Sequence, residues 1–242
     1  MKQFKNPATV RLFLSCFLIL SFLSVFSQEN EASKNIVVAK IDSLYREDQF
    51  YLGFTYNNLR DTPMGYSKGK FSTGFSAGFL RDMPINKKRT VAFAAGMGLT
   101  YNNYNQNIGI SSPNEIPVYT LLDGSMAYSK NKFSQLFIDL PIEFRWRTST
   151  YESHKFWRIY GGFKWSYLVY DRSILSEGLV KTLVKGNKDF NKFNYGAYIS
   201  SGFNTVNVYV YYGLNCLFKS AKIRKEALVV KSLNIGIQFY IL

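Results

Sequence analysis

The chain of 242 residues has few of the side chains that build metal sites, redox centres and disulfides: two cysteines and one histidine. Cys16 lies in an apolar N-terminal segment that we expect to be removed, which would leave Cys216 as a single thiol. A single thiol forms no internal disulfide, and the cysteine count excludes a cysteine-based metal cluster or thiol redox motif. We therefore predict no metal and no cofactor.

Long hydrophobic runs are also missing after residue 27. No later stretch approaches the ~18 consecutive apolar residues that indicate a transmembrane helix. At the N-terminus, three basic residues precede the apolar segment 12–26, and small residues stand at positions 25 and 27. This pattern predicts a secretory signal peptide over residues 1–27, with Gln28 as the first mature residue. The alternative is an uncleaved signal anchor.

Acidic residues are scarce: Asp and Glu total 16 against 30 Lys and Arg, which gives a formal charge of +14. The basic residues are scattered, and neither a nucleic-acid-binding motif nor a helix that could present them is evident. We therefore predict no nucleic-acid partner. Basic loops fit an outer-membrane surface with anionic lipid, and the basic segments 181–189 and 219–225 suggest binding to lipopolysaccharide phosphates. We favour the interpretation that both segments are solvated loops at a charged membrane surface.

What the chain has instead is alternation, most clearly in segment 132–171. Successive side chains of a strand point to opposite faces of a sheet. In the first arm, one face is apolar and aromatic: Leu136, Ile138, Leu140, Ile142, Phe144 and Trp146. The other face carries most of the charge: Gln135, Phe137, Asp139, Glu143, Arg145 and Arg147. The second arm repeats the division after a short polar break at 148–155.

Both arms are long enough to span a bilayer, for which a β-strand needs ~9–11 residues. We interpret the segment as a transmembrane hairpin with its apolar face in lipid and its charged face in a barrel lumen. Aromatic residues make up 17% of the chain, and many would form the interfacial girdles of such a barrel. Pro141 lacks a donor for the sheet ladder, so we expect a β-bulge at this position.

The same alternation recurs along the rest of the chain and predicts eight strands. Besides the two arms, we expect strands at 50–58, 70–81, 90–104, 192–203, 206–218 and 228–242. The connections alternate between long and short, as they do in outer-membrane barrels, which have short periplasmic turns and longer external loops. The sequence therefore predicts an all-β, eight-stranded antiparallel transmembrane β-barrel over residues 49–242, integral to the outer membrane. A segment at 28–48 would precede it in the periplasm.

Eight strands leave an interior just wide enough for side chains to fill it. The lumen candidates are Asp139, Glu143, Arg145, Arg158 and Lys164. A hairpin turn centred near Tyr151 would place Asp139 opposite Lys164. The same turn would place Arg145 opposite Arg158. Charges in so narrow a lumen must be paired, so we interpret them as a structural plug that holds the register. The alternative is an ion or proton path.

Two features outside the strands could carry function. Residues 34–46 have apolar residues at helical spacing, which favours a short helix. We interpret the segment as a loosely ordered tail, and a segment that docks a partner is the alternative. His154, beside Glu152 and Ser153, is the one candidate for acid–base chemistry. It falls in a predicted periplasmic turn, away from the outer-leaflet lipids on which a lipid-modifying barrel enzyme would act. We therefore predict no catalytic residues and no enzyme activity.

Three stretches show a family likeness: Asp42–Tyr51 (DSLYREDQFY), Arg81–Asn86 (RDMPIN), and Phe144–Thr150 with Phe156–Tyr160 (FRWRTST and FWRIY). They resemble the PorT-like outer-membrane barrel proteins of Bacteroidetes-type bacteria. The resemblance covers roughly residues 42–242 and implies a barrel without known catalytic residues. It also implies a role in type IX protein secretion and gliding, through contacts with other envelope components. The alternative function is a small porin-like or structural barrel with a plugged lumen.

Overall fold

Antiparallel strands of unequal length dominate the computed structural model, which describes residues 48–113, 116–122, 128–148 and 156–241. The predicted signal peptide, almost all of segment 28–48 and His154 lie outside these ranges. The long strands are β1 (Gln49–Arg60), β2 (Thr73–Pro84), β3 (Val91–Asn105), β6 (Tyr128–Arg147), β7 (Trp157–Glu177), β9 (Phe193–Phe203), β10 (Val206–Gly213) and β13 (Lys231–Ile241). The short strands are β4 (Ile108–Ser111), β5 (Val118–Leu121), β8 (Val180–Lys185), β11 (Lys222–Ile223) and β12 (Glu226–Ala227).

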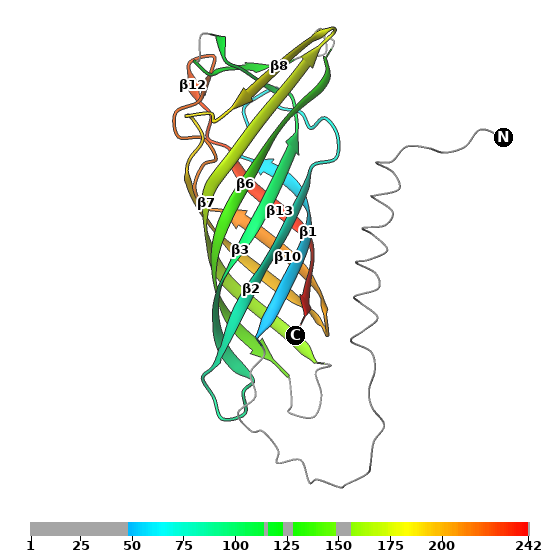
Figure 1. Ribbon diagram of the computed structural model, residues 1–242, viewed down its shortest axis with the longest axis vertical. Coiled ribbons are helices and arrows are strands. Elements are labelled where there is room, and N and C mark those ends of the chain that lie inside the picture. The colour runs from blue at the N-terminus through cyan, green and yellow to red at the C-terminus, as the bar shows by residue number, and fades with distance from the viewer. Residues whose placement is uncertain (1–47, 114–115, 123–127, 149–155, 242) are drawn as a thin grey trace, which may run out of the picture. The chain divides into compact units, whose positions relative to one another are not determined.

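The eight long strands close into one barrel (Figure 1). Each pairs antiparallel with its neighbours in the order β1, β2, β3, β6, β7, β9, β10 and β13, and β13 pairs with β1 to complete the ring. Strand β8 joins the same sheet by pairing with β7 outside the ring. Closure leaves the long strands without unpaired edges, as a sheet in lipid requires. The predicted all-β, eight-stranded antiparallel barrel is therefore confirmed.

The barrel wall is apolar outside and polar inside, as the alternation predicts. On β6, the outward residues Ile138, Leu140, Ile142 and Phe144 are 39–50% exposed, whereas Asp139 and Glu143, which alternate with them, are fully buried. Outward aromatic rings pair across neighbouring strands, for example Phe93 with Phe144. A wall of this kind belongs in hydrocarbon, and the polar residues form the barrel's core.

The two ends of the barrel differ in their connections. Short turns lie at one end, such as 204–205 between β9 and β10, together with Asp48 and the C-terminal end of β13 at Ile241 (Figure 1). Segments 61–72, 106–127, 178–192 and 214–230 lie at the other end. Because outer-membrane barrels have short periplasmic turns, the end with the short turns is the periplasmic end.

The predicted hairpin register is wrong by two residues. Asp139 lies opposite Ser166 rather than Lys164, and Arg145 lies opposite Tyr160 rather than Arg158. A two-residue slip keeps every side chain on its own face, so alternation specifies which face a residue occupies but not which even register the hairpin takes. The residues assigned to the lumen are therefore in the lumen, although they have different neighbours.

The predicted bulge at Pro141 is also wrong. The register between β6 and β7 shifts at Tyr128/Lys130 and at Leu136/Phe137, and Pro141 pairs regularly with Lys164. On its other side, the β3–β6 ladder skips Gly96 and Met97 without a change of register. The missing donor of Pro141 therefore interrupts the pairing of β3 with β6, but it does not produce a bulge with an inserted residue.

The long external connections contain more structure than we predicted. Segment 105–131 contains the β4–β5 hairpin, and β6 begins at Tyr128 rather than at 132. Strand β7 continues to Glu177 and folds back as β8, where we expected a loop. In the other direction, β10 ends at Gly213 rather than 218, and β13 begins at Lys231 rather than 228. In the described residues, no helix is long and apolar enough to cross a bilayer.

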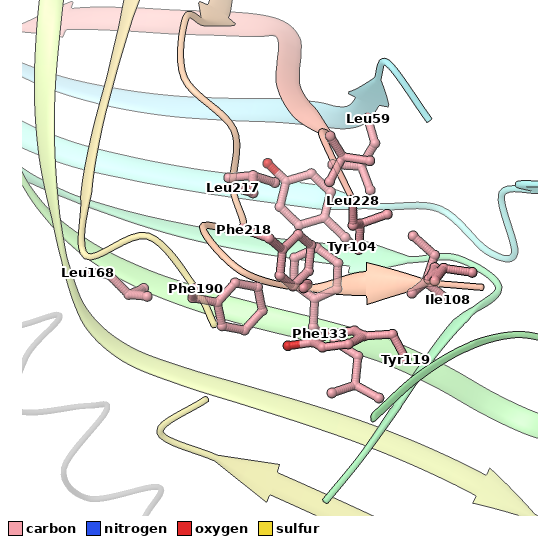
Figure 2. Packing of buried hydrophobic residues seen from close by; sticks show 14 of the residues in the cluster. Leu59, Tyr104, Ile108, Tyr119, Phe133, Leu168, Phe190, Leu217, Phe218 and Leu228 are labelled. Atoms are coloured by element: carbon pink, nitrogen blue, oxygen red, sulfur yellow. The ribbon is translucent and has the colours of Figure 1, made fainter. Parts of the chain in front are cut away.

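These connections pack together into an outer cap with an apolar core (Figure 2). The cap core consists of Leu59, Tyr104, Ile108, Ile110, Tyr119, Phe133, Phe137, Leu168, Phe190, Leu217, Phe218, Ala221, Ile223, Leu228 and Val230. Its aromatic rings stack: Tyr104 lies on Phe133 at 4.9 Å and Phe190 on Phe218 at 4.6 Å between ring centres. The cap core covers the external mouth of the barrel.

Candidate functional site: the charged lumen

The periplasmic half of the lumen contains a buried network of two carboxylates and two arginines. Asp82 Oδ1 lies 3.0 Å from Arg145 Nη1 and 2.8 Å from Arg147 Nη1, and Asp82 Oδ2 lies 2.8 Å from Arg147 Nη2. Arg145 Nε donates to Glu143 Oε2 at 2.9 Å. All four side chains have no exposed surface. The paired contacts of Arg147 with Asp82 are the geometry in which a buried ion pair is strongest.

The neighbouring strands are shaped to let this network form. Asp82 on β2 and Glu143 on β6 flank Ala94 of β3 in one row of the sheet. Ala94 has a small side chain, so Asp82 can reach past β3 to the arginines of β6. A larger inward side chain at position 94 would occupy that space.

Glu143 also joins opposite walls of the barrel. Its Oε1 accepts hydrogen bonds from the hydroxyls of Tyr198 on β9 at 2.9 Å and Tyr240 on β13 at 3.1 Å. Together with Arg145, these groups satisfy both carboxylate oxygens. A buried carboxylate with this many donors is held in one position.

A second charged pair lies nearer the external end. Lys164 Nζ lies 3.6 Å from Asp139 Oδ2, so the two predicted partners meet diagonally rather than directly across the hairpin. Asp139 also accepts hydrogen bonds from Thr100 and Ser166. The Lys164 ammonium lies over the Tyr211 ring at 4.6 Å, a cation–π contact.

Arg158, the fifth predicted lumen residue, lies among aromatic rings. It is 2% exposed, and its guanidinium lies 4.5 Å from the ring centre of Phe156, with Tyr240 at 5.6 Å and Tyr160 at 5.7 Å. These rings make cation–π contacts with the guanidinium.

The structure adds Asp82, Arg147, Tyr198 and Tyr240 to the five residues that the sequence indicated. Arg147 was already on the inward face of the first arm. Asp82 falls on the even-numbered inward positions of β2, but we ended that strand at residue 81 and so omitted it. The two tyrosines come from strands distant in sequence, and nothing in their local pattern marks them as partners of Glu143.

Little space remains between these side chains. The void beside Glu143 and Lys164 has a volume of about 10 Å³. The void on the other side of Lys164, lined by Asn102, Tyr211 and Asn234, measures about 20 Å³. A single water needs roughly 10–15 Å³, so each void holds about one. No room for a substrate or a hydrated ion is present at either place.

The outer cap extends the seal with polar contacts of its own. Tyr119 lies in the cap core, and its hydroxyl accepts a hydrogen bond from Asn187 Nδ2 at 2.8 Å and lies 3.1 Å from Asp189 Oδ2. Burial raises the pKa of Tyr119 above its usual value, as does the nearby carboxylate of Asp189, while hydrogen bonding to Asn187 opposes the shift. Tyr119 therefore stays neutral at physiological pH.

In the part of the chain that the structure describes, no three His, Cys, Asp or Glu side chains gather where a metal ion could be held. The buried carboxylates already have basic or hydroxyl partners and face no substrate-sized cavity. This arrangement fills and braces a barrel. His154, the one predicted acid–base candidate, lies outside the described residues.

A closed β-sheet with an apolar outer wall and a filled polar interior defines a membrane-spanning β-barrel protein. The family model of the outer membrane protein beta-barrel domain matches residues 26–219, which is well over half of the chain. The chain belongs to this family, and the family and fold imply a location in the outer membrane.

Two further comparisons add little. The chain is similar to the solved structure of Ail, the attachment invasion locus protein of Yersinia pestis, at 10% identity and a TM-score of 0.39; the match covers 82% of this chain and all of Ail. This likeness is too loose to bear on function. No curated protein matches the sequence.

Proposed function

We propose that this barrel is a non-enzymatic envelope protein that supports type IX protein secretion and gliding through contacts with other envelope proteins. The stretches that resemble PorT-like barrels motivate the proposal. In the structure, their described parts lie together at the periplasmic end: the start of β1, the end of β2, the end of β6 and the start of β7. They also contact one another, since Arg81 pairs with Asp48 at 3.5 Å and Asp82 binds Arg145 and Arg147.

This convergence is the observation that carries the proposal. Because side chains fill the lumen, a partner protein could not insert a segment into it and would have to bind a rim or a loop of the barrel. The turn between β2 and β3 presents Ile85, 59% exposed, together with the exposed Lys87 and Lys88 at that rim. Segment 28–48 would be exported with the barrel after removal of residues 1–27, and would dock a periplasmic component.

The first test is a clean deletion, with the secretome compared between the deletion strain and its complemented parent. We expect proteins with type IX sorting domains to accumulate in the cell and to reappear outside on complementation. An unchanged secretome would contradict the secretion role.

The second test uses complementation with Lys87→Glu/Lys88→Glu, which reverses the charge of the periplasmic turn. Secretion should fall while the amount of folded barrel in the outer membrane stays constant. Lys219→Glu/Lys222→Glu is the matched control, because it makes the same charge change in exposed residues at the external end. Equal secretion by the two variants would contradict docking at the periplasmic rim.

A structural barrel with a plugged lumen is the second candidate. The voids of about 10 and 20 Å³ in the lumen favour it over a small porin. If deletion leaves the export of type IX cargo unchanged but increases leakage of periplasmic proteins, this structural role takes the lead.

A lipid-modifying enzyme remains testable through His154. We expect His154→Ala to leave the lipid profile of the outer membrane unchanged. A changed profile, restored by the wild-type gene, would assign an activity that the described residues give no reason to expect.

A further inference from the structure

Strands β6, β7 and β8 continue the barrel wall past the membrane as a three-stranded sheet (Figure 1). Opposed residues of antiparallel strands lie on the same face. Ser134, Arg172 and Lys185 form one row of this sheet, Lys132, Ile174 and Leu183 the next, and Lys130, Ser176 and Lys181 the third. These rows make up the outward face, which we call the cationic face.

The cationic face carries five basic residues and no acidic one. The acidic residues of β7, Asp171 and Glu177, occupy the alternate positions and point to the other face. Within the described residues, none of the five cations forms an ion pair with a carboxylate. The face is therefore a concentrated positive surface with no internal counter-charge.

The row nearest the membrane is the least favourable for the protein alone. Arg172 and Lys185 lie directly opposite each other on neighbouring strands. Like charges in this position repel and destabilise a sheet. Lys132 lies one row away, diagonal to Arg172. An anionic group seated between these three side chains would remove the repulsion and gain charge-assisted hydrogen bonds, including a planar pair from the guanidinium.

The outward residues of the same strands, below the cationic face, indicate which chemical group is attached to that anion. Immediately below the face, Leu136 and Tyr170 oppose each other. Further along the outward wall follow Ile138, Leu140 and Trp165, which are 39–50% exposed. Tyr167 packs on Phe193 at 5.0 Å between ring centres, as part of the aromatic belt at the bilayer boundary. Cations thus stand directly above an apolar wall, a pattern that fits a ligand with phosphates at the surface and acyl chains in the bilayer.

We propose that the cationic face of β6, β7 and β8 is a binding site for a phosphorylated glycolipid of the outer leaflet, with Lys132, Arg172 and Lys185 holding its phosphate. This site does not depend on a role in secretion. Of the two basic segments that the sequence indicated, it includes Lys181 and Lys185 of segment 181–189 and leaves out segment 219–225, which belongs to the connection between β10 and β13.

The test compares purified, folded barrels in phosphatidylcholine nanodiscs that contain diphosphorylated lipid A. Bound lipid A is quantified after washing in wild type, in Lys132→Gln/Arg172→Gln/Lys185→Gln, and in the control Lys219→Gln/Lys222→Gln/Lys225→Gln. Both triple variants remove three positive charges from the external end. We expect about a tenfold loss of retained lipid A for the first variant, and wild-type retention for the control.

Two further arms identify the source of the phosphate. Dephosphorylated lipid A with the same acyl chains should be retained poorly by all three proteins. Inorganic phosphate should compete only weakly, because it lacks the acyl chains that meet the apolar wall. Equal loss in both triple variants, equal retention of dephosphorylated lipid A, or full competition by inorganic phosphate would each overturn the proposal.

Folding is monitored separately, because Arg172 is only partly exposed. Heat-modified migration in a gel reports the closed barrel, and Lys132→Gln/Lys185→Gln leaves Arg172 in place. We expect this double variant to migrate as a folded barrel and to lose an intermediate amount of lipid A. Wild-type retention by the folded double variant would contradict the assignment.

Discussion

At the level of the bilayer the interior of the barrel is charged, whereas the interior of the outer cap is apolar. In the lumen, Asp82, Glu143 and Arg145 are fully buried and bonded to one another. In the cap, Phe133 and Phe190 are equally buried, but among aromatic and aliphatic side chains. The same chain thus builds two cores of opposite chemistry, one directly above the other.

The difference follows from the solvent outside each core. Around the lumen the solvent is lipid, so the wall must be apolar and polar residues have only the interior left to occupy. Around the cap the solvent is water, and burial of apolar surface again drives packing, at about 25 cal/mol per Å². The lumen must therefore be stable through paired charges and hydrogen bonds, and the cap through apolar contact.

The largest expected effect comes from breaking the lumen network at one partner. Asp82→Ala would leave Arg145 and Arg147 without their shared carboxylate and should destabilise the barrel by about 3–5 kcal/mol. Urea unfolding of the refolded protein measures this free energy. The control is Asp61→Asn, whose partner Lys231 lies at the surface; we expect it to behave like wild type. Equal stability of the two variants would contradict the claim that the buried charge network stabilises the barrel.

The corresponding change in the cap should remain local. Phe190→Ala removes a ring that stacks on Phe218 and contacts Phe133. Removing a buried aromatic ring costs about 3–5 kcal/mol of the stability of the core that contains it, which here is the cap core. Because the strands below are closed by their own ladder, we expect faster proteolysis of the external segments and a nearly unchanged unfolding midpoint of the barrel. A large drop in that midpoint would show that cap and lumen unfold as one unit.

Adding a methyl group to the tightly packed lumen should cause a smaller loss of stability. A Cβ on Gly98 would lie 2.0 Å from the Tyr51 hydroxyl and 2.8 Å from the Ala77 carbonyl oxygen, so Gly98→Ala should cost about 1–3 kcal/mol. Gly161 is the matched control, since a Cβ there would lie 4.0 Å from the backbone oxygen of Tyr198. We expect Gly161→Ala to unfold like wild type. Equal unfolding curves would mean that the lumen is more loosely packed than its small voids indicate.

We expect the smallest net loss of stability when both members of a buried charged pair are replaced in the same variant. Lys164→Met alone leaves Asp139 buried with a charge balanced only by Thr100 and Ser166, and should destabilise the barrel. Adding Asp139→Asn removes that charge and keeps a polar group for the hydroxyls, so the double variant should recover most of the loss. A double-mutant cycle in urea measures the coupling. Additive losses would indicate that the pair is not coupled.

The contrast between lumen and cap also explains what the sequence could predict. Alternation along β6 and β7 was enough to identify the inward residues, because one face of each strand must be apolar. It could not choose between registers two residues apart, and so it placed Asp139 opposite Lys164. Glu143 contacts Tyr198 and Tyr240 only after the ring has closed, and closure is a property of all eight strands.

The cap was harder to predict for a related reason. Its core combines residues near the external ends of long strands, such as Leu59 and Phe133, with residues of the connections, such as Phe218. Segment 105–131 was therefore expected to be a loop, although it contains the β4–β5 hairpin. Residues that pack through tertiary contact alone leave little periodic signal.

Among the residues that the structure describes, side chains fill the lumen and its external mouth and leave no continuous path of water through the barrel. Single-channel recording of the purified, folded protein in a planar bilayer tests this claim most directly. The account predicts no steady current at any applied voltage, because the spaces beside Lys164 hold about one water each. Steady, ohmic single-channel currents from the wild-type barrel would contradict it.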